Sequence, residues 1–269
     1  MEITKQINQE IDYSRQYKRW HSETPEHAQQ IKNLYRENIS RFLPEDKEIH
    51  VLDVGCGMGF AMMFLQDLGY ASVEGIDVDY AQVQSCLSKK LNVTQVEDSN
   101  EFLYRMSGRY DLIIALDVIE HIPHERQLDF VRAIQGALKP GGKIICTVPN
   151  GNSPLASRWR YIDWTHYSLF TEYSLDFLLY NAGFDNIEVH GIEYFHPPQI
   201  PPFFSRAIFK KSLWNWVLSK GFQKSLLHWQ LFKVVRFWHR IVMIAELGWE
   251  QGMVLPISPN ILATGVKRV

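Results

Sequence analysis

Cysteine is scarce in this chain of 269 residues, which contains Cys56, Cys86 and Cys146 alone. The three lie far apart, with neither paired nor metal-type spacing, which argues against a disulfide framework and a cysteine-based metal site. We expect reduced, mostly buried thiols in an intracellular protein. No uninterrupted apolar run reaches the roughly 18 residues that a membrane span needs, and the polar start lacks a signal-peptide core. A cytoplasmic protein is therefore expected.

Acidic residues are absent from Tyr194 to Ala245, a segment that carries eight Lys and Arg. Because the net charge of the whole chain is −2, the rest of the chain is acidic. The segment falls in a connection of about 60 residues between two predicted strands, and connections of that length usually carry function or their own structure. We expect residues 196–259 to form a basic, amphipathic helical insertion, called the cap below.

Short runs rich in Val and Ile alternate with segments whose apolar residues recur at spacings of three and four. This alternation favours an α/β fold with a doubly wound, Rossmann-like sheet. The sheet is expected to have seven mostly parallel strands, an antiparallel last strand and a helical insertion before it. The strands are expected at residues 49–55, 72–78, 110–116, 143–149, 186–195 and 260–269, with one more in the region before residue 98. The expected domains are an N-terminal helical arm or lid (1–44), a main domain (45–195 plus 260–269) and the cap (196–259).

Residues 52–60, LDVGCGMGF, place glycines at every second position after the first predicted strand. The pattern differs from the dinucleotide fingerprint GxGxxG, because Phe60 stands where the third glycine would be. Glycines at the carboxyl end of a strand let the backbone approach a ligand. Asp77 ends the second strand, where it can accept hydrogen bonds from ribose hydroxyls, and Asp98 can accept from an exocyclic amine. The sequence therefore predicts a nucleoside-containing ligand. In the alternative, the glycines serve only the packing of a tight turn between the strand and the next helix.

The ordered set LDVGCGMGF, GIDVD, ED, YDLIIALDVIEHI and LKPGGKIICTVPN resembles the class I S-adenosylmethionine-dependent methyltransferases. The resemblance covers about residues 45–190 plus the final strand. It implies that S-adenosyl-L-methionine is the cofactor, with its methionine part at the glycine loop, its ribose at Asp77 and its adenine near Asp98. The residues expected to line the cofactor site are Asp53, Gly55, Cys56, Gly57, Gly59, Asp77, Val78, Asp98, Ser99 and Leu116.

The run LDVIEHI, where the fourth predicted strand ends, supplies a candidate metal site in Asp117, Glu120 and His121. Oxygen ligands with one imidazole suit a divalent cation such as Mg²⁺, which would orient a hydroxylated substrate and lower its pKa. The run is similar to the metal-binding run of the ubiquinone-biosynthesis O-methyltransferases, with Asp117 where a longer acid usually stands. In the alternative, Glu120 and His121 cap the next helix and line the pocket without a metal.

Residues 160–171, RYIDWTHYSLFT, supply a second group of candidate catalytic residues. His166 lies beside Asp163 in an aromatic loop, so it is expected to act as a base or substrate clamp, with Asp163 fixing its tautomer. His121 is the other candidate base. The segment resembles the Thr-His segment of methyltransferases that act on glycans and of the quinone enzymes. A purely structural histidine is the alternative.

These motifs predict O-methylation by S-adenosylmethionine. The expected acceptor is a hydroxyl of a glycan or lipid-linked saccharide in surface polysaccharide biosynthesis. The alternatives are a polyprenylated phenol of quinone biosynthesis and a small soluble metabolite. A regulatory subunit that binds S-adenosylmethionine without catalysis is the alternative of another class.

The cap mixes basic and aromatic residues on predicted helices. Lys233, Arg236 and Arg240 are spaced to share one helix face, with Phe232 and Trp238 on others. This composition favours peripheral association of residues 203–245 with the inner face of an anionic membrane, against a substrate lid as the alternative. No nucleic acid partner is expected, because no RNA-binding module is visible and the rest of the chain is acidic.

Overall fold

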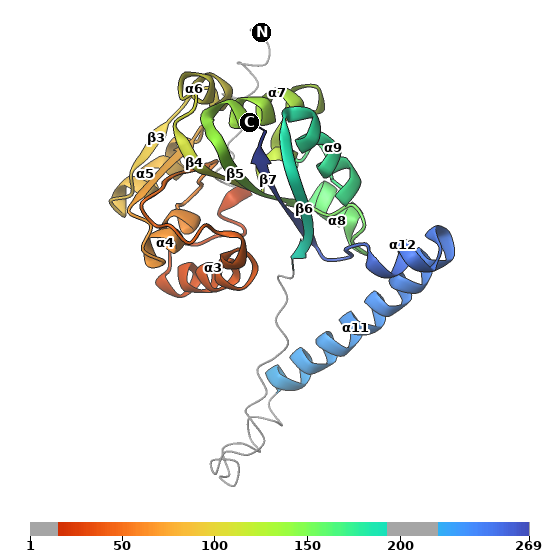
Figure 1. Ribbon diagram of the computed structural model, residues 1–269. Coiled ribbons are helices and arrows are strands. Elements are labelled where there is room, and N and C mark those ends of the chain that lie inside the picture. The colour runs from red at the N-terminus through yellow and green to blue at the C-terminus, as the bar shows by residue number, and fades with distance from the viewer. Residues whose placement is uncertain (1–15, 193–219, 269) are drawn as a thin grey trace.

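The computed structural model describes residues 16–192 and 220–268, with side chains at 16–192 and 230–268 (Figure 1). Its centre is one seven-stranded sheet in the order β3-β2-β1-β4-β5-β7-β6. The strands are β1 (His50–Val54), β2 (Ser72–Asp77), β3 (Val93–Gln95), β4 (Tyr110–Leu116), β5 (Leu138–Pro149), β6 (Phe184–Ile192) and β7 (Asn260–Lys267).

The first five strands pair in parallel, and β7 runs antiparallel between β5 and β6. This is the doubly wound, Rossmann-like arrangement expected from the alternating pattern, and the fold class is confirmed. The seventh strand and its reversed direction are also as predicted.

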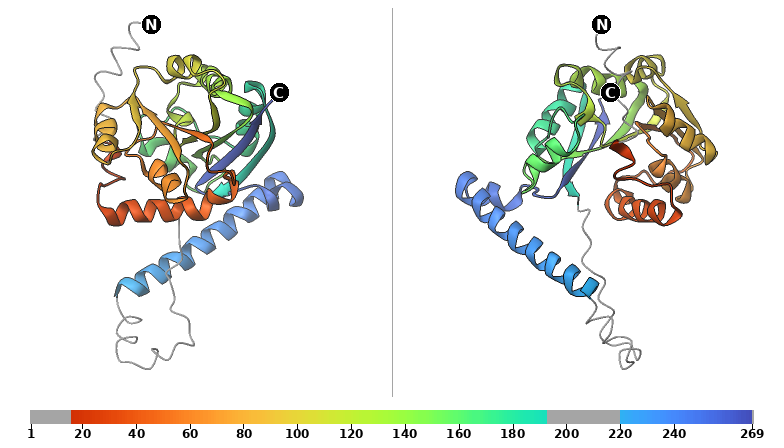
Figure 2. Two further views of the ribbon diagram at one scale, coloured as in Figure 1. Left: turned by 60° about the vertical axis from the view of Figure 1, so that its left-hand side comes forward. Right: turned by 180° about the vertical axis from the view of Figure 1, so that it is seen from behind.

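Helices connect and cover the strands (Figures 1 and 2). Several begin with a side-chain cap: Asp79 accepts from the backbone N–H of Gln82 at 3.0 Å, and Thr171 and Ser174 form a capping box. The helices are α3 (Pro25–Asn38), α4 (Phe60–Asp67), α5 (Tyr80–Ser88), α6 (Ser99–Arg105), α7 (His124–Ala137), α8 (Ala156–Ile162), α9 (Glu172–Ala182), α11 (Lys220–Leu247) and α12 (Trp249–Val254), with short 3₁₀ turns η1 (Ser40–Phe42) and η2 (Ile119–His121).

The core lies in two layers because successive side chains of a strand point to opposite faces of the sheet. In β4, Ile113 packs into the layer that contains Phe130 of α7, whereas Leu112 and Ile114 pack into the layer that contains Phe64 of α4. A strand buried on both faces reads as a continuous apolar run, which is why YDLIIAL was recognisable in the sequence.

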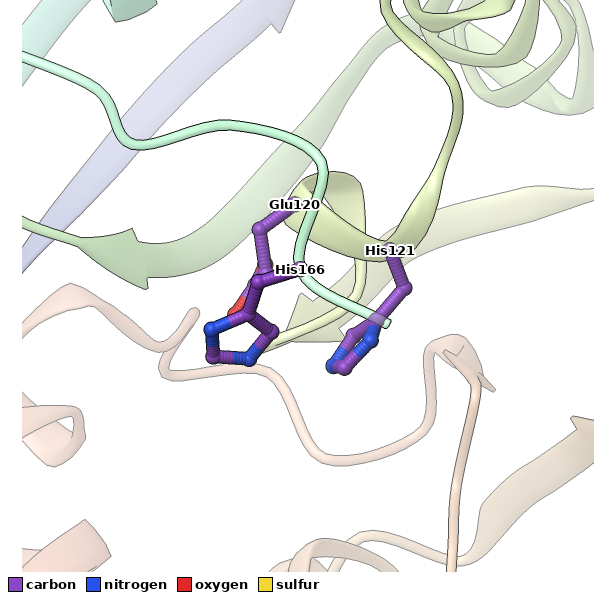
Figure 3. A group of neighbouring side chains, drawn as sticks. All are labelled: Glu120, His121 and His166. Atoms are coloured by element: carbon purple, nitrogen blue, oxygen red, sulfur yellow. The ribbon is translucent and has the colours of Figure 1, made fainter. Parts of the chain in front are cut away.

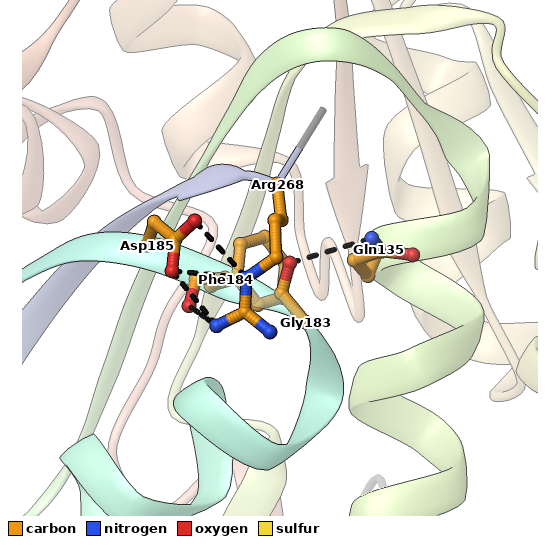
Figure 4. A network of polar contacts seen from close by, with 5 residues as sticks. All are labelled: Gln135, Gly183, Phe184, Asp185 and Arg268. Carbon is orange, nitrogen blue, oxygen red and sulfur yellow. Dashed lines mark hydrogen bonds and ion pairs between the residues drawn. The ribbon is translucent and has the colours of Figure 1, made fainter.

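The edge formed by β6 is tied to the end of β7 by a polar network (Figure 4). Arg268 donates from Nε and Nη2 to the carboxylate of Asp185, at 2.8 to 3.0 Å, and from Nη2 to the carbonyl of Phe184. On the neighbouring helix α7, the amide of Gln135 donates to the carbonyl of Gly183. These contacts hold the antiparallel pair in register at its far end.

The boundaries depart from the expected ones at a few places. Strand β5, expected at 143–149, already begins at Leu138, which pairs with Tyr110 and directly follows the end of α7. The strand expected at 186–195 spans Phe184–Ile192. Of the expected arm, 16–44 includes α3, and of the expected cap, 220–254 contains α11 and α12. The domain division itself stays a prediction, and residues 1–15, 193–219 and 269 lie outside the described part.

Figures 1 and 2 show α11 extending away from the sheet, with α12 folded back beside its C-terminal end. Gly252 of α12 makes this close approach possible, because a Cβ at that position would meet the backbone of Ile244. Within the described ranges, no helix combines the length and the apolar character needed to cross a membrane.

Candidate functional site

The glycine loop leaves β1 in left-handed backbone conformations. Gly55, Gly57 and Gly59 have φ values of +69°, +54° and +78°, a region that side chains rarely tolerate. A Cβ at Gly57 would also collide with the hydroxyl of Tyr17, and one at Gly55 would meet Val118. The glycines are therefore needed to make room for Tyr17 and Val118 of the same chain, and a ligand bound at the loop would be an additional neighbour.

Two carboxylates flank the loop. Asp77 accepts from the backbone N–H of Gly57 at 2.8 Å and from that of Asp79 at 2.8 Å, which fixes the loop to the end of β2. Asp53 is buried, and its Oδ2 has no hydrogen-bond partner among the described residues. Burial raises the pKa of both carboxyl groups.

The Oδ2 of Asp53, unpaired among the described residues and beside the glycine loop, could accept a hydrogen bond from a cationic group of a ligand. The α-ammonium group of S-adenosylmethionine would be such a donor. The residues at this edge of the sheet therefore fit the expected cofactor.

The other residues expected at the cofactor lie along the same sheet edge, because β3, β2, β1 and β4 are neighbours. Val78, just after β2, is 57% exposed and offers an apolar surface. Asp98 caps α6 by accepting from Asn100 N–H at 2.7 Å, and it pairs with Arg126 at 3.0 Å. The contact of Asp98 with adenine stays a prediction. The positions of Cys56, Ser99 and Leu116 at the cofactor stay predictions as well.

We expect Asp77→Ala to weaken binding of S-adenosylmethionine by about 10- to 100-fold, because hydrogen bonds to a charged group are worth about 1.5–3 kcal/mol. The same change releases Gly57 from β2. Titration calorimetry measures the affinity, and Asp67→Ala, which breaks only a surface pair with Lys32, is the control. Equal affinities of Asp77→Ala and the unaltered protein would contradict this assignment.

A second group of polar residues lies where β4 ends, next to the glycine loop (Figure 3). His121 Nδ1 lies 2.8 Å from Thr165 Oγ1, and that hydroxyl donates to Asp163 at 2.6 Å. Because the threonine proton goes to the carboxylate, His121 must donate from Nδ1, so its basic nitrogen is Nε2. Burial, assisted by the neighbouring His166, lowers the pKa of His121 to about 4.

His166 adopts the same tautomer by a different contact. Its Nδ1 lies 2.7 Å from the carbonyl oxygen of Trp159, which can only accept, so Nε2 is again the basic nitrogen. The rings of His121 and His166 lie 4.7 Å apart in an edge-to-face arrangement. The expectation that Asp163 fixes the tautomer of His166 is therefore not met: Asp163 acts on His121 through Thr165, and a backbone carbonyl holds His166.

Glu120 completes this cluster. It is fully buried, and neither carboxylate oxygen has a hydrogen-bond partner among the described residues. Burial raises the pKa of Glu120 well above its ordinary value, with the negative charge of Asp117 adding to the effect. One ligand atom from each of Glu120, His121 and His166 lies within 4.8 Å of the others.

Asp117 lies outside this group of three, unlike the predicted metal site. Its Oδ1 accepts from Thr147 at 3.0 Å and from Asn260 at 2.6 Å, which links the end of β4 to β5 and β7. Two imidazoles and one carboxylate are also a poor set for Mg²⁺, which prefers oxygen ligands. The structure thus gives the Mg²⁺ expectation no support, and no step below involves a metal.

Tyr17 is the residue of this region that sequence reasoning missed. It is buried against the glycine loop, and burial raises the pKa of its hydroxyl. Its neighbour Gln16 donates to the carbonyl of Ile162 at 3.0 Å, so the segment touches both the loop and the end of α8. The polar first residues carry no motif, and only the aromatic residues in YSRQYKRW could have drawn attention to them.

Comparisons with known proteins identify the family and the fold. The sequence profile of a family described as "Methyltransferase domain" matches residues 8–189. The Ubiquinone biosynthesis O-methyltransferase of Erwinia tasmaniensis is 32% identical over 108 residues, which cover 38% of this chain and 43% of that relative. The mitochondrial enzyme of the same name from Dictyostelium discoideum is 29% identical over 134 residues, 44% of this chain and 41% of the relative. The chain thus aligns with less than half of the length of these curated relatives.

Solved structures show the same fold. A SAM-dependent methyltransferase from Archaeoglobus fulgidus superimposes with a TM-score of 0.61 at 20% identity, over 89% of this chain and 94% of that chain. Phosphoethanolamine N-methyltransferase 2 from Haemonchus contortus, solved with S-adenosylhomocysteine, gives a TM-score of 0.55 at 19% identity, over 88% of this chain and 53% of that chain. At these identities the likeness concerns the fold.

Proposed function

Because this chain belongs to the S-adenosylmethionine-dependent methyltransferases, we propose that it methylates a hydroxyl oxygen, with a polyprenylated phenol as the acceptor. S-adenosylmethionine, when bound, supplies a methyl group on an electrophilic sulfonium, so the protein must position the acceptor and take its proton. Membership of an enzyme family sets aside the non-catalytic reading.

The observation that carries the proposal is the tautomer of His121. Its Nε2 carries the lone pair, while Nδ1–H is held by Thr165 and Asp163. A low pKa keeps this imidazole neutral at physiological pH, so it is available to accept a proton. When it does, the Asp163 carboxylate stabilises the resulting cation through Thr165. General base catalysis of this kind is worth about 10²- to 10⁴-fold in rate.

His166 is the second histidine of this site. Its ring lies 4.7 Å from that of His121, so both imidazoles can contact one acceptor. We assign His166 to holding the acceptor, since its Nδ1 is fixed by the Trp159 carbonyl and its Nε2 can accept a hydrogen bond.

The acceptor class rests on the curated relatives, whose names contain ubiquinone biosynthesis and O-methylation. A phenol also suits a weak buried base better than a sugar hydroxyl, because a phenol is the stronger acid. Neither the structure nor the comparisons support the saccharide acceptor that was expected from the Thr-His segment. The saccharide acceptor is therefore kept only as one of the probes in the experiment below.

The test supplies the purified protein with methyl-labelled S-adenosylmethionine and three probes: a short-chain prenylated catechol, a prenyl-linked saccharide and phosphoethanolamine. We expect a methyl ether of the catechol, identified by mass spectrometry, at a rate unchanged by a chelator. Label on the saccharide alone would restore the glycan reading. Label on the amine alone would replace oxygen by nitrogen as the acceptor atom.

A further inference from the structure

Helix α11 carries a continuous apolar stripe on its outer side. Six side chains recur at spacings of three, four and seven residues and are between 38% and 61% exposed. We call this set the outer stripe: Leu231, Val234, Val235, Trp238, Ile241 and Val242. Phe237, 61% exposed, lies beside Trp238 with its ring in edge-to-face contact. The stripe is large for a surface that a folded domain leaves open.

The opposite side of α11 faces the rest of the protein, and its contacts are largely polar. Arg240 donates from Nη1 to the carbonyls of Gly252 at 2.7 Å and Leu255 at 2.8 Å. His239 Nε2 donates to the carbonyl of Asn152 at 2.9 Å. Among the residues at this end, Met243 is buried against Leu255.

This arrangement is the reverse of an ordinary surface helix, whose apolar face packs on the core and whose polar face meets water. The polar contacts of Arg240 and His239 fix the rotation of α11, so the outer stripe cannot turn inward without breaking them. The described domain therefore leaves much of the apolar surface of the stripe exposed.

Charge indicates the partner. Residues 194–245 contain no acidic residue and eight basic ones. On α11, Lys233 and Arg236 are spaced to share the face of Arg240, so the helix separates a basic face from an apolar, aromatic one, as interfacial helices do. An anionic lipid surface supplies both phosphate charge and apolar depth, and aromatic residues favour its headgroup region.

Figure 2 shows that α11 lies along the outside of the molecule, with the sheet on one side of it. Since Arg240 and His239 join the opposite face of α11 to the rest of the protein, the outer stripe faces away from the described domain. We propose that the outer stripe of α11 docks the enzyme on anionic membranes as an interfacial helix. The inference stands independently of the acceptor, because it uses no residue of the methylation site.

The experiment is flotation of the full chain with vesicles made of phosphatidylcholine and phosphatidylglycerol in equal parts, or of phosphatidylcholine alone. We expect flotation with the anionic vesicles, weakened by high salt. Trp238→Glu should lower the partition coefficient by more than about ten-fold, because it places a charge where an apolar ring enters the interface. Phe177→Glu is the matched control, since Phe177 is 69% exposed on α9, and it should float like the unaltered protein.

Both side chains are exposed, so neither change should alter the thermal transition, which is measured in parallel. An unaltered protein that stays at the bottom of the gradient with anionic vesicles at low salt overturns the inference. So does an equal loss in Phe177→Glu. A second copy of this chain is the alternative partner of the stripe, and light scattering of the protein without vesicles tests it. If the unaltered protein is a dimer that does not float, and Trp238→Glu converts it to a monomer, the stripe is a dimer interface.

Discussion

His121→Ala is expected to lower turnover by about 10²- to 10⁴-fold, while changing the affinity for S-adenosylmethionine by less than about three-fold. The substitution removes the basic Nε2 and leaves the glycine loop and Asp77 in place. Turnover is measured with saturating cofactor, and affinity by titration calorimetry.

His124→Ala is the matched control for this change, because His124 is an exposed histidine at the start of α7. It should leave both quantities unchanged. Retention of turnover in His121→Ala would remove His121 from the mechanism. A parallel loss of cofactor affinity would instead make it part of the binding site.

Glu120→Gln is expected to raise the free energy of unfolding of the cofactor-free, chelator-treated protein by about 1–3 kcal/mol. The carboxyl group has no partner among the described residues, so its ionised form is costly and burial raises its pKa. The neutral amide keeps the shape and removes the charge. Glu120 would then lower the stability of the folded protein, as residues of functional sites often do.

The gain should depend on pH with a defined sign. The folded-state pKa of Glu120 lies above its ordinary value of 4.5, so the folded protein binds more protons than the unfolded chain at higher pH. Stability is therefore lost as pH rises above that value, and the advantage of Glu120→Gln grows in the same direction. Thermal unfolding at two pH values measures it.

Glu97→Gln is the control for Glu120→Gln, because Glu97 is exposed before α6. Its effect should stay within about 0.5 kcal/mol. A lower melting temperature for Glu120→Gln than for the unaltered protein would show that the carboxylate is paired and stabilising in solution.

The fold was predictable because its signals are local. A doubly buried strand such as YDLIIAL and a glycine loop such as LDVGCGMGF each carry their pattern within ten residues. The approach of Glu120 and His121 to His166 was partly predictable, since both segments follow neighbouring strands β4 and β5.

The pairings within the site were not predictable, because they depend on side-chain directions. Sequence proximity suggested that Asp163 orients His166, whereas the hydroxyl of Thr165 directs that carboxylate toward His121. Asp117 adopts a positive φ of 56° and turns to Asn260, 143 residues away. Tyr17 reaches the glycine loop from a segment without a motif. Contacts of this range leave no trace in a local pattern.

The position of β7 between β5 and β6 also bears on how the protein is made. Strand β6 ends at Ile192, and the only strand it pairs with among the described residues, β7, begins at Asn260. On the ribosome, β6 therefore waits without a partner while α11 and α12 are synthesised. Its unpaired edge and the apolar outer stripe are exposed at the same time, which is the period when a nascent chain is most prone to aggregate. Strand β7 pairs with both β5 and β6, so its synthesis completes the sheet in one late step.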